Sequence, residues 1–232
     1  MEFWDINGIP VKSFSQELKI GKNSVVQIAG SGGKTTLTYV LAEENKHLKT
    51  AVLTTTKRFA PKDGYLLKDG EVMDISKIKG NFLEAGVLDD MGKIGWVGDN
   101  NYGILRDFED LIIIEADGAK RLPLKAAEEY EPVFVPDATH TIVVCGLSAL
   151  GKSVSEVCHR YGLIADKFAS DTIVSEEIIG YLLTEFYFKR FKELNPIFIL
   201  NQANNNDLVQ KGIKILKEFG LKGYVGALKG TR

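Results

Sequence analysis

The residues AGSGGKTT (29–36) connect a short apolar run, VVQI (25–28), to a segment in which apolar side chains recur at helical spacing. A glycine-rich turn between a strand and a helix can direct backbone N–H groups at a bound phosphate, and the helix N-terminus adds a partial positive charge. The context of strand, glycines, lysine and helix therefore predicts a phosphate-binding loop. The alternative is a glycine-rich turn that contains a lysine by chance.

The loop departs from the usual G-x-x-x-x-G-K-[ST] pattern, because Ile28 stands where that pattern has its first glycine. The remaining G-x-x-G-K-T-T resembles the phosphate loops of the Mur ligases, which also lack the earlier glycine. The departure therefore indicates a variant of the phosphate loop. We expect Lys34, as an exposed loop lysine, to contact the outer phosphates of a nucleotide and to act in catalysis, and Thr35 to bind Mg²⁺. The residues expected to bind ATP or GTP around the loop are Gly30, Ser31, Gly32, Gly33, Lys34, Thr35 and Thr36.

Two carboxylates follow the apolar run of DLIIIEAD (110–117). Glu115 and Asp117 are two residues apart, so both can point at one metal ion if the strand persists. We expect them to hold Mg²⁺ together with Thr35, whereas a strand that turns at Ala116 would leave Asp117 free to position water or substrate. The alternative is a solvated acidic strand end.

The order of segments predicts an α/β fold with a doubly wound, mostly parallel sheet of P-loop NTPase type. Near-continuous apolar runs suit strands that are buried on both faces. The expected strands are 24–30, 50–56, 110–117, 141–147, 196–203 and 223–228, and the expected helices are 34–47, 174–191 with a Ser175 cap, and 207–220. We expect a single domain over residues 1–232, with a small β-rich insertion at 57–109 that contains a hairpin or edge strands.

Several cations lie close to strand ends, where ligands of open α/β sheets bind. They suggest a second, anionic ligand. The alternatives are a solvated charge cluster and, for His159 and Arg160, a surface or packing role. These candidate substrate residues are Lys57, which precedes another cation, Arg58, together with Lys120, Arg121, Lys125, His159 and Arg160.

A polar motif, ILNQAN (199–204), ends a late predicted strand and resembles the guanine-reading N-K-x-D motif in its position and in Asn201. Gln202 replaces the lysine and Asn204 the aspartate. We expect Asn201 to contact the nucleotide base, but the sequence leaves ATP and GTP equally open, and a strand end with polar residues remains the alternative.

The composition is that of an ordinary globular chain, and it limits the classes of partner that we expect. The 29 basic and 31 acidic side chains leave a formal net charge of -2, which gives no footprint for nucleic acid or an anionic membrane. No apolar stretch approaches the ~20 residues that span a bilayer, and the N-terminus lacks the pattern of a secretory signal. The expected location is the cytoplasm.

Five segments in the same order resemble the YqeC family, whose members are accessory proteins assigned to selenium-dependent molybdenum hydroxylases. They are VVQIAGSGGKTTL, VLTTTKRF, IIIEADGAKRLPLKAAEEYEPVFVP, VVCGLSALGKSV and CHR, between about residues 24 and 204. The resemblance implies a nucleotide-dependent step in the maturation of a molybdenum enzyme or of its selenium-containing cofactor. Nothing in the residue chemistry itself points to selenium.

Two kinds of mechanism agree with these observations. In the first, the chain is an NTP hydrolase or phosphoryl-transfer enzyme that acts on a small anion such as a molybdopterin-type cofactor. In the second, it is a nucleotide-gated assembly factor that binds a molybdenum hydroxylase and turns over slowly. Turnover without any partner distinguishes them.

Overall fold

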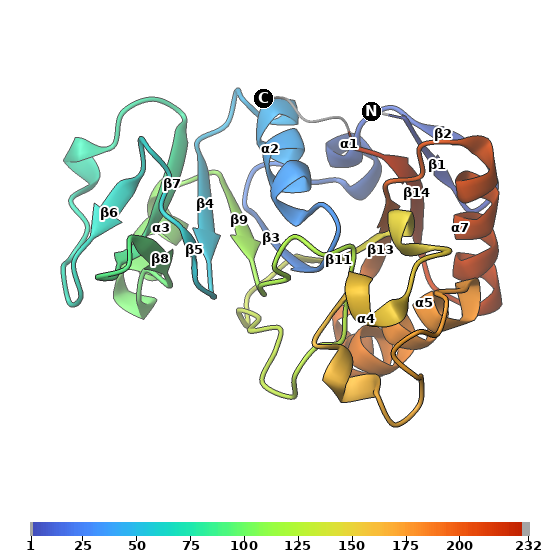
Figure 1. Cartoon of the computed structure of the whole chain (residues 1–232). Coiled ribbons are helices and arrows are strands. Elements are labelled where there is room, and N and C mark those ends of the chain that lie inside the picture. The colour runs from blue at the N-terminus through green and yellow to red at the C-terminus, as the bar shows by residue number, and fades with distance from the viewer. Residues whose placement is uncertain (1, 229–232) are drawn as a thin grey trace.

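The computed structural model describes residues 2–228, which form an α/β fold around one mixed, mostly parallel sheet (Figure 1). In its centre, β3 (Ser24–Gly30) pairs in parallel with β9 (Leu111–Glu115) on one side and β11 (His140–Gly146) on the other. Outside β9 lie β4 (Thr50–Thr54) and β7 (Phe82–Leu88), and outside β11 lie β13 (Ile197–Asn201) and β14 (Gly223–Ala227), each parallel to its inner neighbour. The predicted parallel strands are confirmed, with ends that shift by up to two residues.

Both edges of the sheet carry short strands that make it mixed. At one edge, β1 (Glu2–Asp5) pairs antiparallel with β14 and with β2 (Pro10–Val11). At the other edge, β8 (Lys93–Gly95) pairs antiparallel with β7 and with β5 (Arg58–Phe59), while β6 (Tyr65–Leu67) runs parallel to β7. We call residues 57–95, which contain β5, β6, β7 and β8, the β5–β8 extension. It contains the predicted hairpin, formed by β7 and β8.

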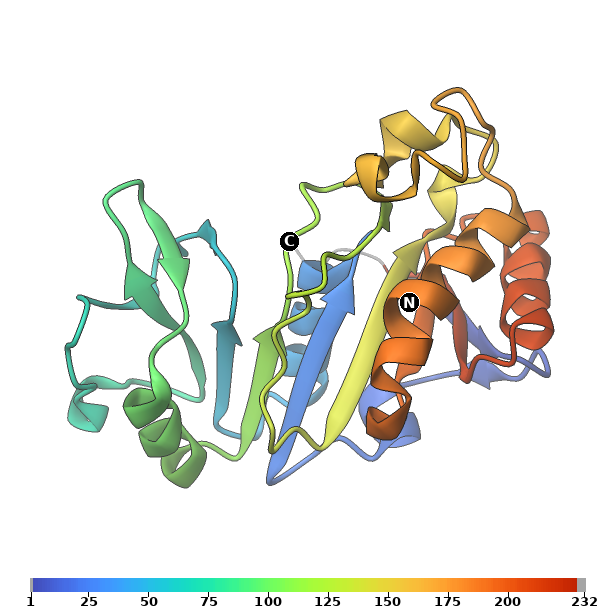
Figure 2. The ribbon, with the colours of Figure 1, turned by 90° about the horizontal axis from the view of Figure 1, so that it is seen from below.

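Helices cover both faces of the sheet (Figure 2). α1 (Phe14–Leu18) and α2 (Lys34–Glu44) pack on one face, against a cluster that includes Val26 and Ile28 of β3. α3 (Asp99–Phe108), α5 (Glu176–Leu183) and α7 (Asn206–Glu218) cover the opposite face. Successive strand residues point to opposite faces, and those that alternate with Val26 and Ile28 pack in two further apolar clusters together with these helices. α3 was not anticipated in the glycine-rich interval.

The helix expected over 174–191 is divided in the structure. α5 is followed by a π-helical turn (Thr184–Phe188) and by the single turn α6 (Lys189–Phe191). Ser175 does precede the helix, but its side chain makes no capping hydrogen bond. The remaining short elements are α4 (Val154–Val157), the paired strands β10 (Leu124–Lys125) and β12 (Cys158–His159), and 3₁₀ turns at Ile75–Lys77, Leu147–Ala149, Tyr161–Ile164 and Lys192–Leu194.

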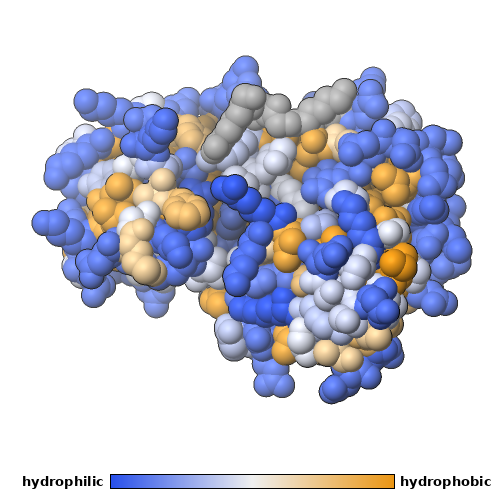
Figure 3. All heavy atoms as spheres, viewed as in Figure 1, coloured by the Kyte–Doolittle hydropathy of each residue, from blue (hydrophilic) through white to orange (hydrophobic). Residues whose placement is uncertain are grey.

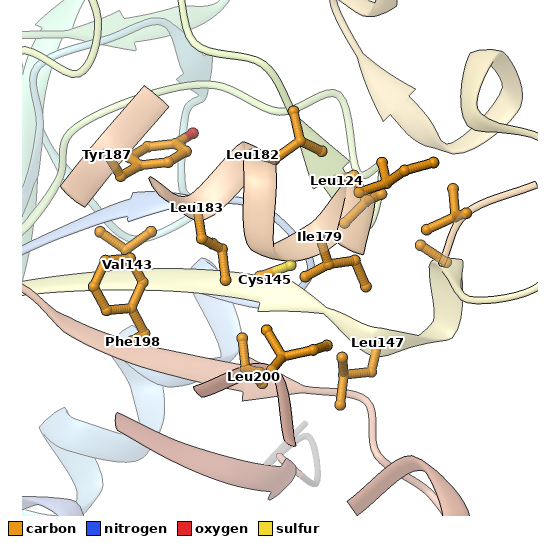
Figure 4. Packing of buried hydrophobic residues seen from close by; sticks show 14 of the residues in the cluster. Leu124, Val143, Cys145, Leu147, Ile179, Leu182, Leu183, Tyr187, Phe198 and Leu200 are labelled. Atoms are coloured by element: carbon orange, nitrogen blue, oxygen red, sulfur yellow. The ribbon is translucent and has the colours of Figure 1, made fainter. Parts of the chain in front are cut away.

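The largest core cluster lies between the sheet and two helical segments, α7 and α5 with the π-helical turn that follows it (Figure 4). Leu183 and Tyr187 come from the second of these segments and pack near Val143 of β11 and Phe198 of β13. The complete or nearly complete burial of Leu183, Val143 and Phe198 removes apolar side chains from water, and each is worth about 1.5–3 kcal/mol. The loops at the carboxyl ends of β9 and β11 pack on this core. No helix between residues 2 and 228 is long and apolar enough to cross a membrane.

Candidate phosphate-binding site

The turn between β3 and α2 uses glycines where other residues would clash. Gly30, Gly32 and Gly33 all have positive φ, at 92°, 71° and 141°. A Cβ on Gly30 would collide with the Val144 carbonyl oxygen of β11, and one on Gly33 would collide with the Asn201 side chain of β13. The loop is therefore pressed against the strands on its β11 side, and only glycine permits this approach.

The backbone N–H groups of this loop divide into two sets. Gly30 N–H donates to Asp117 Oδ2 (3.1 Å), and Ser31 N–H donates to the Val144 carbonyl (2.8 Å). The Ser31 hydroxyl is also engaged, since it donates to the Pro123 carbonyl (2.8 Å). Among the described residues, by contrast, none accepts from the N–H groups of residues 32–36. These donors surround the first turn of α2, which is the arrangement that binds a phosphate.

Lys34 differs from the exposed loop lysine that we expected. It is buried, with only 7% of its side chain exposed. Its Nζ donates to the Gly30 carbonyl (2.5 Å) and lies 3.0 Å from Asp117 Oδ1. The expectation was wrong because a carboxylate from another strand end lies within reach and compensates the buried charge.

Asp117 lies beyond the end of β9 and is buried. Its Oδ2 accepts from Gly30 N–H and from Lys125 Nζ (2.9 Å), while its Oδ1 faces Lys34. Both oxygens therefore face cations or N–H groups of the protein. In this arrangement Asp117 holds the loop and its lysine.

Glu115 has a different environment at the end of β9. It shares a face with Ile113, which packs in the same cluster as α2, so Glu115 points to the α2 side of the sheet. Its Oε1 is buried without a hydrogen bond from any described residue, and Arg58 Nη1 lies 3.8 Å away. Arg58 makes its close ion pair with Glu84 of β7. Glu84, which the sequence analysis did not single out, also accepts from the Tyr39 hydroxyl of α2 (2.9 Å).

These two carboxylates differ in how well they fit a metal ion. Glu115 offers a carboxylate oxygen without a hydrogen bond, and the exposed Thr35 hydroxyl belongs to the first turn of α2, on the same side of the sheet. Asp117 Oδ1 also lacks a hydrogen bond of good geometry, but the two lysines beside Asp117 already neutralise its charge. The described residues contain no cluster of three or more His, Cys, Asp or Glu side chains suited to a metal. A Mg²⁺ ion bound to phosphates needs only one or two carboxylates, and Glu115 with Thr35 is the pair of residues that could hold one here.

Asn201 supports the loop from the end of β13. Its Nδ2 donates to the Gly32 carbonyl (2.7 Å), and its Oδ1 accepts from Leu228 N–H (2.8 Å). The neighbouring Gln202 is also engaged, since it accepts from the Ser148 hydroxyl (2.5 Å). The expected contact between Asn201 and a base thus has a structural competitor, because the amide is used at both ends.

The candidate substrate cations do not form one group. Lys57 pairs with Asp89 in the β5–β8 extension (2.8 Å). Lys125 is buried and pairs with Asp117 and Glu131, so our expectation of an exposed cation was wrong. Lys120 and Arg121 are exposed and both adopt positive φ, at 46° and 63°.

The remaining two candidate substrate residues, His159 and Arg160, lie beside Lys125. β12 pairs in parallel with β10, which puts His159 in register with Lys125. Burial and the charges of Arg160, Lys125 and Lys120 lower the pKa of His159, so these cations act on one imidazole. The structure therefore brings Lys120, Lys125, His159 and Arg160 together and leaves Lys57 apart.

A surface hollow of about 660 Å³ lies elsewhere, at the amino ends of β4 and β7. Thr50 of β4 and Phe82 of β7 line it from the sheet, Tyr39 lines it from α2, and Lys46 lines it from the turn after α2. Because the phosphate loop stands at the carboxyl ends of the strands, this hollow is not part of the candidate site.

Comparisons with known proteins agree with the sequence resemblance. A family model described as "YqeC protein" matches residues 26–162. A curated protein of Escherichia coli (strain K12), described as "Uncharacterized protein YqeC", is 31% identical over 153 residues. These residues are 62% of this chain and 60% of that protein, so the chain spans less than two thirds of the relative's length. No solved structure matches the chain significantly. The family match contains the loop, Glu115, Asp117 and Lys125, and it ends before Asn201.

Proposed function

The chain belongs to the YqeC family, and from this membership we propose that it is a Mg²⁺-dependent nucleotide-binding protein of P-loop NTPase type. The observation that carries the proposal is the set of N–H groups at residues 32–36 without acceptors among the described residues, beside the buried Lys34. A triphosphate of ATP or GTP supplies the acceptors and the negative charge that this loop lacks. The position of Glu115 on the strand next to β3 supports the metal part of the proposal.

In this proposal the residues have separate tasks. The loop N–H groups and Lys34 bind the outer phosphates, and Thr35 and Glu115 hold the ion. When bound, Mg²⁺ offsets charge on the phosphates. Asp117 holds Lys34 and Gly30 before nucleotide arrives, and once released from Lys34 it is placed to orient a nucleophile. The activity that follows is hydrolysis or transfer of the γ-phosphoryl group.

Replacement of Lys34 tests nucleotide binding. We expect Lys34→Ala to weaken the affinity for ATP or GTP at least tenfold, because a charge-assisted hydrogen bond is worth ~1.5–3 kcal/mol and 1.4 kcal/mol is tenfold. Isothermal titration calorimetry with and without Mg²⁺ measures this, and Lys46→Ala is the matched control, because Lys46 is an exposed lysine in the turn just after α2. Because Lys34 is buried, circular dichroism must first show that the variant is folded. Affinity within twofold of the unchanged protein would contradict the proposal.

We further propose a second, anionic ligand at the carboxyl ends of β9 and β11. Lys120, His159 and Arg160 support it, since they lie near one another beside the β10–β12 pair. Family membership suggests a phosphorylated, molybdopterin-type cofactor and a role in maturing a selenium-dependent molybdenum hydroxylase. No contact in the structure identifies selenium chemistry.

The exposed pair Lys120 and Arg121 offers the cleanest test of this second ligand. The double change Lys120→Ala with Arg121→Ala should weaken binding of such a cofactor while nucleotide affinity stays within twofold. The binding should also fall with added salt, because exposed cations are screened over ~8–10 Å at physiological ionic strength. Titrations with each ligand at two salt concentrations measure both effects. Equal loss of both ligands would assign these residues to the triphosphate.

One observation favours the alternative, a nucleotide-gated assembly factor. Large apolar side chains are exposed on the β5–β8 extension, among them Phe59 at 73% and Met91 at 72% (Figure 3). Exposed apolar side chains that gather in one region are typical of surfaces that bind another protein. Nucleotide turnover measured on the isolated chain separates the two: substantial turnover supports the enzyme, and turnover that appears only with a molybdenum hydroxylase supports the assembly factor.

A further inference from the structure

Charged side chains form a continuous buried row that starts at the phosphate loop. Lys34 faces Asp117 (3.0 Å), Asp117 accepts from Lys125 (2.9 Å), and Lys125 faces Glu131 (2.7 Å). Arg160 then binds both oxygens of Glu131. Positive and negative groups alternate along the row, and the side chains of Asp117 and Lys125 are 0% exposed.

The row ends at the surface of the β10–β12 pair. Arg160 is also 3.7 Å from Glu128, and its guanidinium lies over the exposed ring of Tyr130. Burial alone would raise the pKa of Glu131, but hydrogen bonds from Arg160 and Lys125 outweigh it, and the pKa is lowered. Glu131 is therefore held in its ionised form, and it competes with Asp117 for the ammonium group of Lys125.

Lys34 must change partners when a triphosphate binds. Its Nζ is held by the Gly30 carbonyl and by Asp117, and on the proposed nucleotide binding it moves from Asp117 toward a phosphate at the loop N–H groups. A buried carboxylate left without a cation is very unfavourable. Asp117 avoids this state, because Lys125 and Gly30 N–H remain as its partners.

We propose that Lys125 is a positioning residue that keeps Asp117 neutralised and so makes Lys34 available to an incoming triphosphate. Glu131 opposes this effect by drawing on the same ammonium group. The inference rests on the proposed nucleotide binding and adds to it a residue that touches no nucleotide. It gives Lys125 a role different from the anion contact that its sequence suggested.

The proposal predicts changes of opposite sign. Among residues 2–228, Lys125→Met leaves Lys34 as the only lysine partner of Asp117, so nucleotide affinity should fall at least fivefold. Glu131→Gln gives Lys125 wholly to Asp117, so affinity should rise at least twofold. Both changes break a buried ion pair and should lower stability, so a purely structural role would move both affinities in the same direction.

A change of net charge would by itself also lower the affinity for an anion in Lys125→Met and raise it in Glu131→Gln. The Asp117→Asn background distinguishes this charge effect from the proposed one. With a neutral side chain at 117, no carboxylate there holds Lys34, so Lys125→Met should change affinity less than twofold in that background. Lys211→Met is the matched control, because it removes an exposed lysine that pairs with Asp207 on α7. It should leave affinity within twofold.

The measurement is fluorescence titration of the full chain with N-methylanthraniloyl-labelled ATP and GTP. It is made in EDTA, so that a bound metal ion does not contribute to the affinities that are compared. A fivefold loss for Lys125→Met that vanishes in the Asp117→Asn background supports the proposal, and a loss that persists there overturns it. If Lys125→Met does not fold, Glu131→Gln decides: a gain only when Asp117 is present supports the proposal, and any other result overturns it. Binding by the unchanged protein with no effect of Lys125→Met overturns this inference alone, whereas no binding by the unchanged protein overturns the proposed function as well.

Discussion

At the scale of single residues, Asn201 shows how one amide can fix a loop that is distant in sequence. Its two hydrogen bonds join the Gly32 carbonyl of the phosphate loop to Leu228 after β14. Gly33 has no room for a side chain because this amide occupies the space. The two positions are therefore coupled, and a change at either should disturb the same loop.

We predict that Asn201→Ala weakens nucleotide binding severalfold without changing the ratio of ATP to GTP affinity. The change removes the partner of the Gly32 carbonyl and of Leu228 N–H, and since both groups are only partly buried, each loss costs less than the roughly 1–3 kcal/mol of a fully buried group. Urea unfolding and titrations with both nucleotides measure these effects. Asn204→Ala is the control, since Asn204 is exposed. A changed nucleotide preference would instead mean that Asn201 reads the base.

At the scale of elements, the carboxyl end of α3 carries an unfavourable charge. Glu109 directly follows α3, its N–H donates to the Leu105 carbonyl (2.8 Å), and its side chain is buried. A carboxylate at a helix C-terminus opposes the helix dipole. Burial raises the pKa of Glu109 to about 7, with Lys49 lowering it and Asp110 raising it.

This shift predicts a pH dependence of stability. A carboxyl group with a raised pKa binds its proton more tightly in the folded state, so the stability it contributes is lost as pH rises from about 4.5 to about 7. Glu109→Gln, which stays neutral, should therefore unfold at higher urea than the unchanged protein at pH 8, with a smaller difference at pH 5. Equal differences at the two pH values would contradict the assignment.

At the scale of the whole molecule, the β5–β8 extension shares its core with the central sheet. β7 continues the parallel sheet beyond β4, and one apolar cluster contains Leu83 of β7, Leu53 of β4 and Ile114 of β9. Elements that share a core tend to unfold together. This continuity supports a single domain that includes the 57–109 interval.

The two tryptophans allow a test, because they stand near opposite edges of the sheet. Trp4 lies in β1, and Trp96 follows β8. We predict that Trp4→Phe and Trp96→Phe, each reporting on the remaining tryptophan, show unfolding midpoints in urea that coincide with the loss of circular dichroism. A separate, earlier transition seen only through Trp96 would make the extension an independent unit.

The amino-acid sequence determined the local structure of this protein. The apolar runs, the glycines of residues 30–33 and the periodicity after Lys34 specify strands, a turn and a helix through rules that act between near neighbours. The central strands and α2 were therefore predictable within a few residues, as were Glu115 and Asp117 at the end of β9. The glycine-rich sequence around α3 hid a helix, because packing on the sheet outweighed its weak local preference.

Only the tertiary structure decided which charges meet. Lys34 and Lys125 read as exposed cations in the sequence, and both are buried because Asp117 and Glu131 supply carboxylates within ion-pair distance. A buried charge is tolerable only beside a partner, and the partner's place depends on strand order and on how the loops after β9 fold back. Asn201 is a similar case, since β13 brings it to Gly32 across the sheet from far along the chain. Such pairings arise between distant segments, so no local rule of sequence can reveal them.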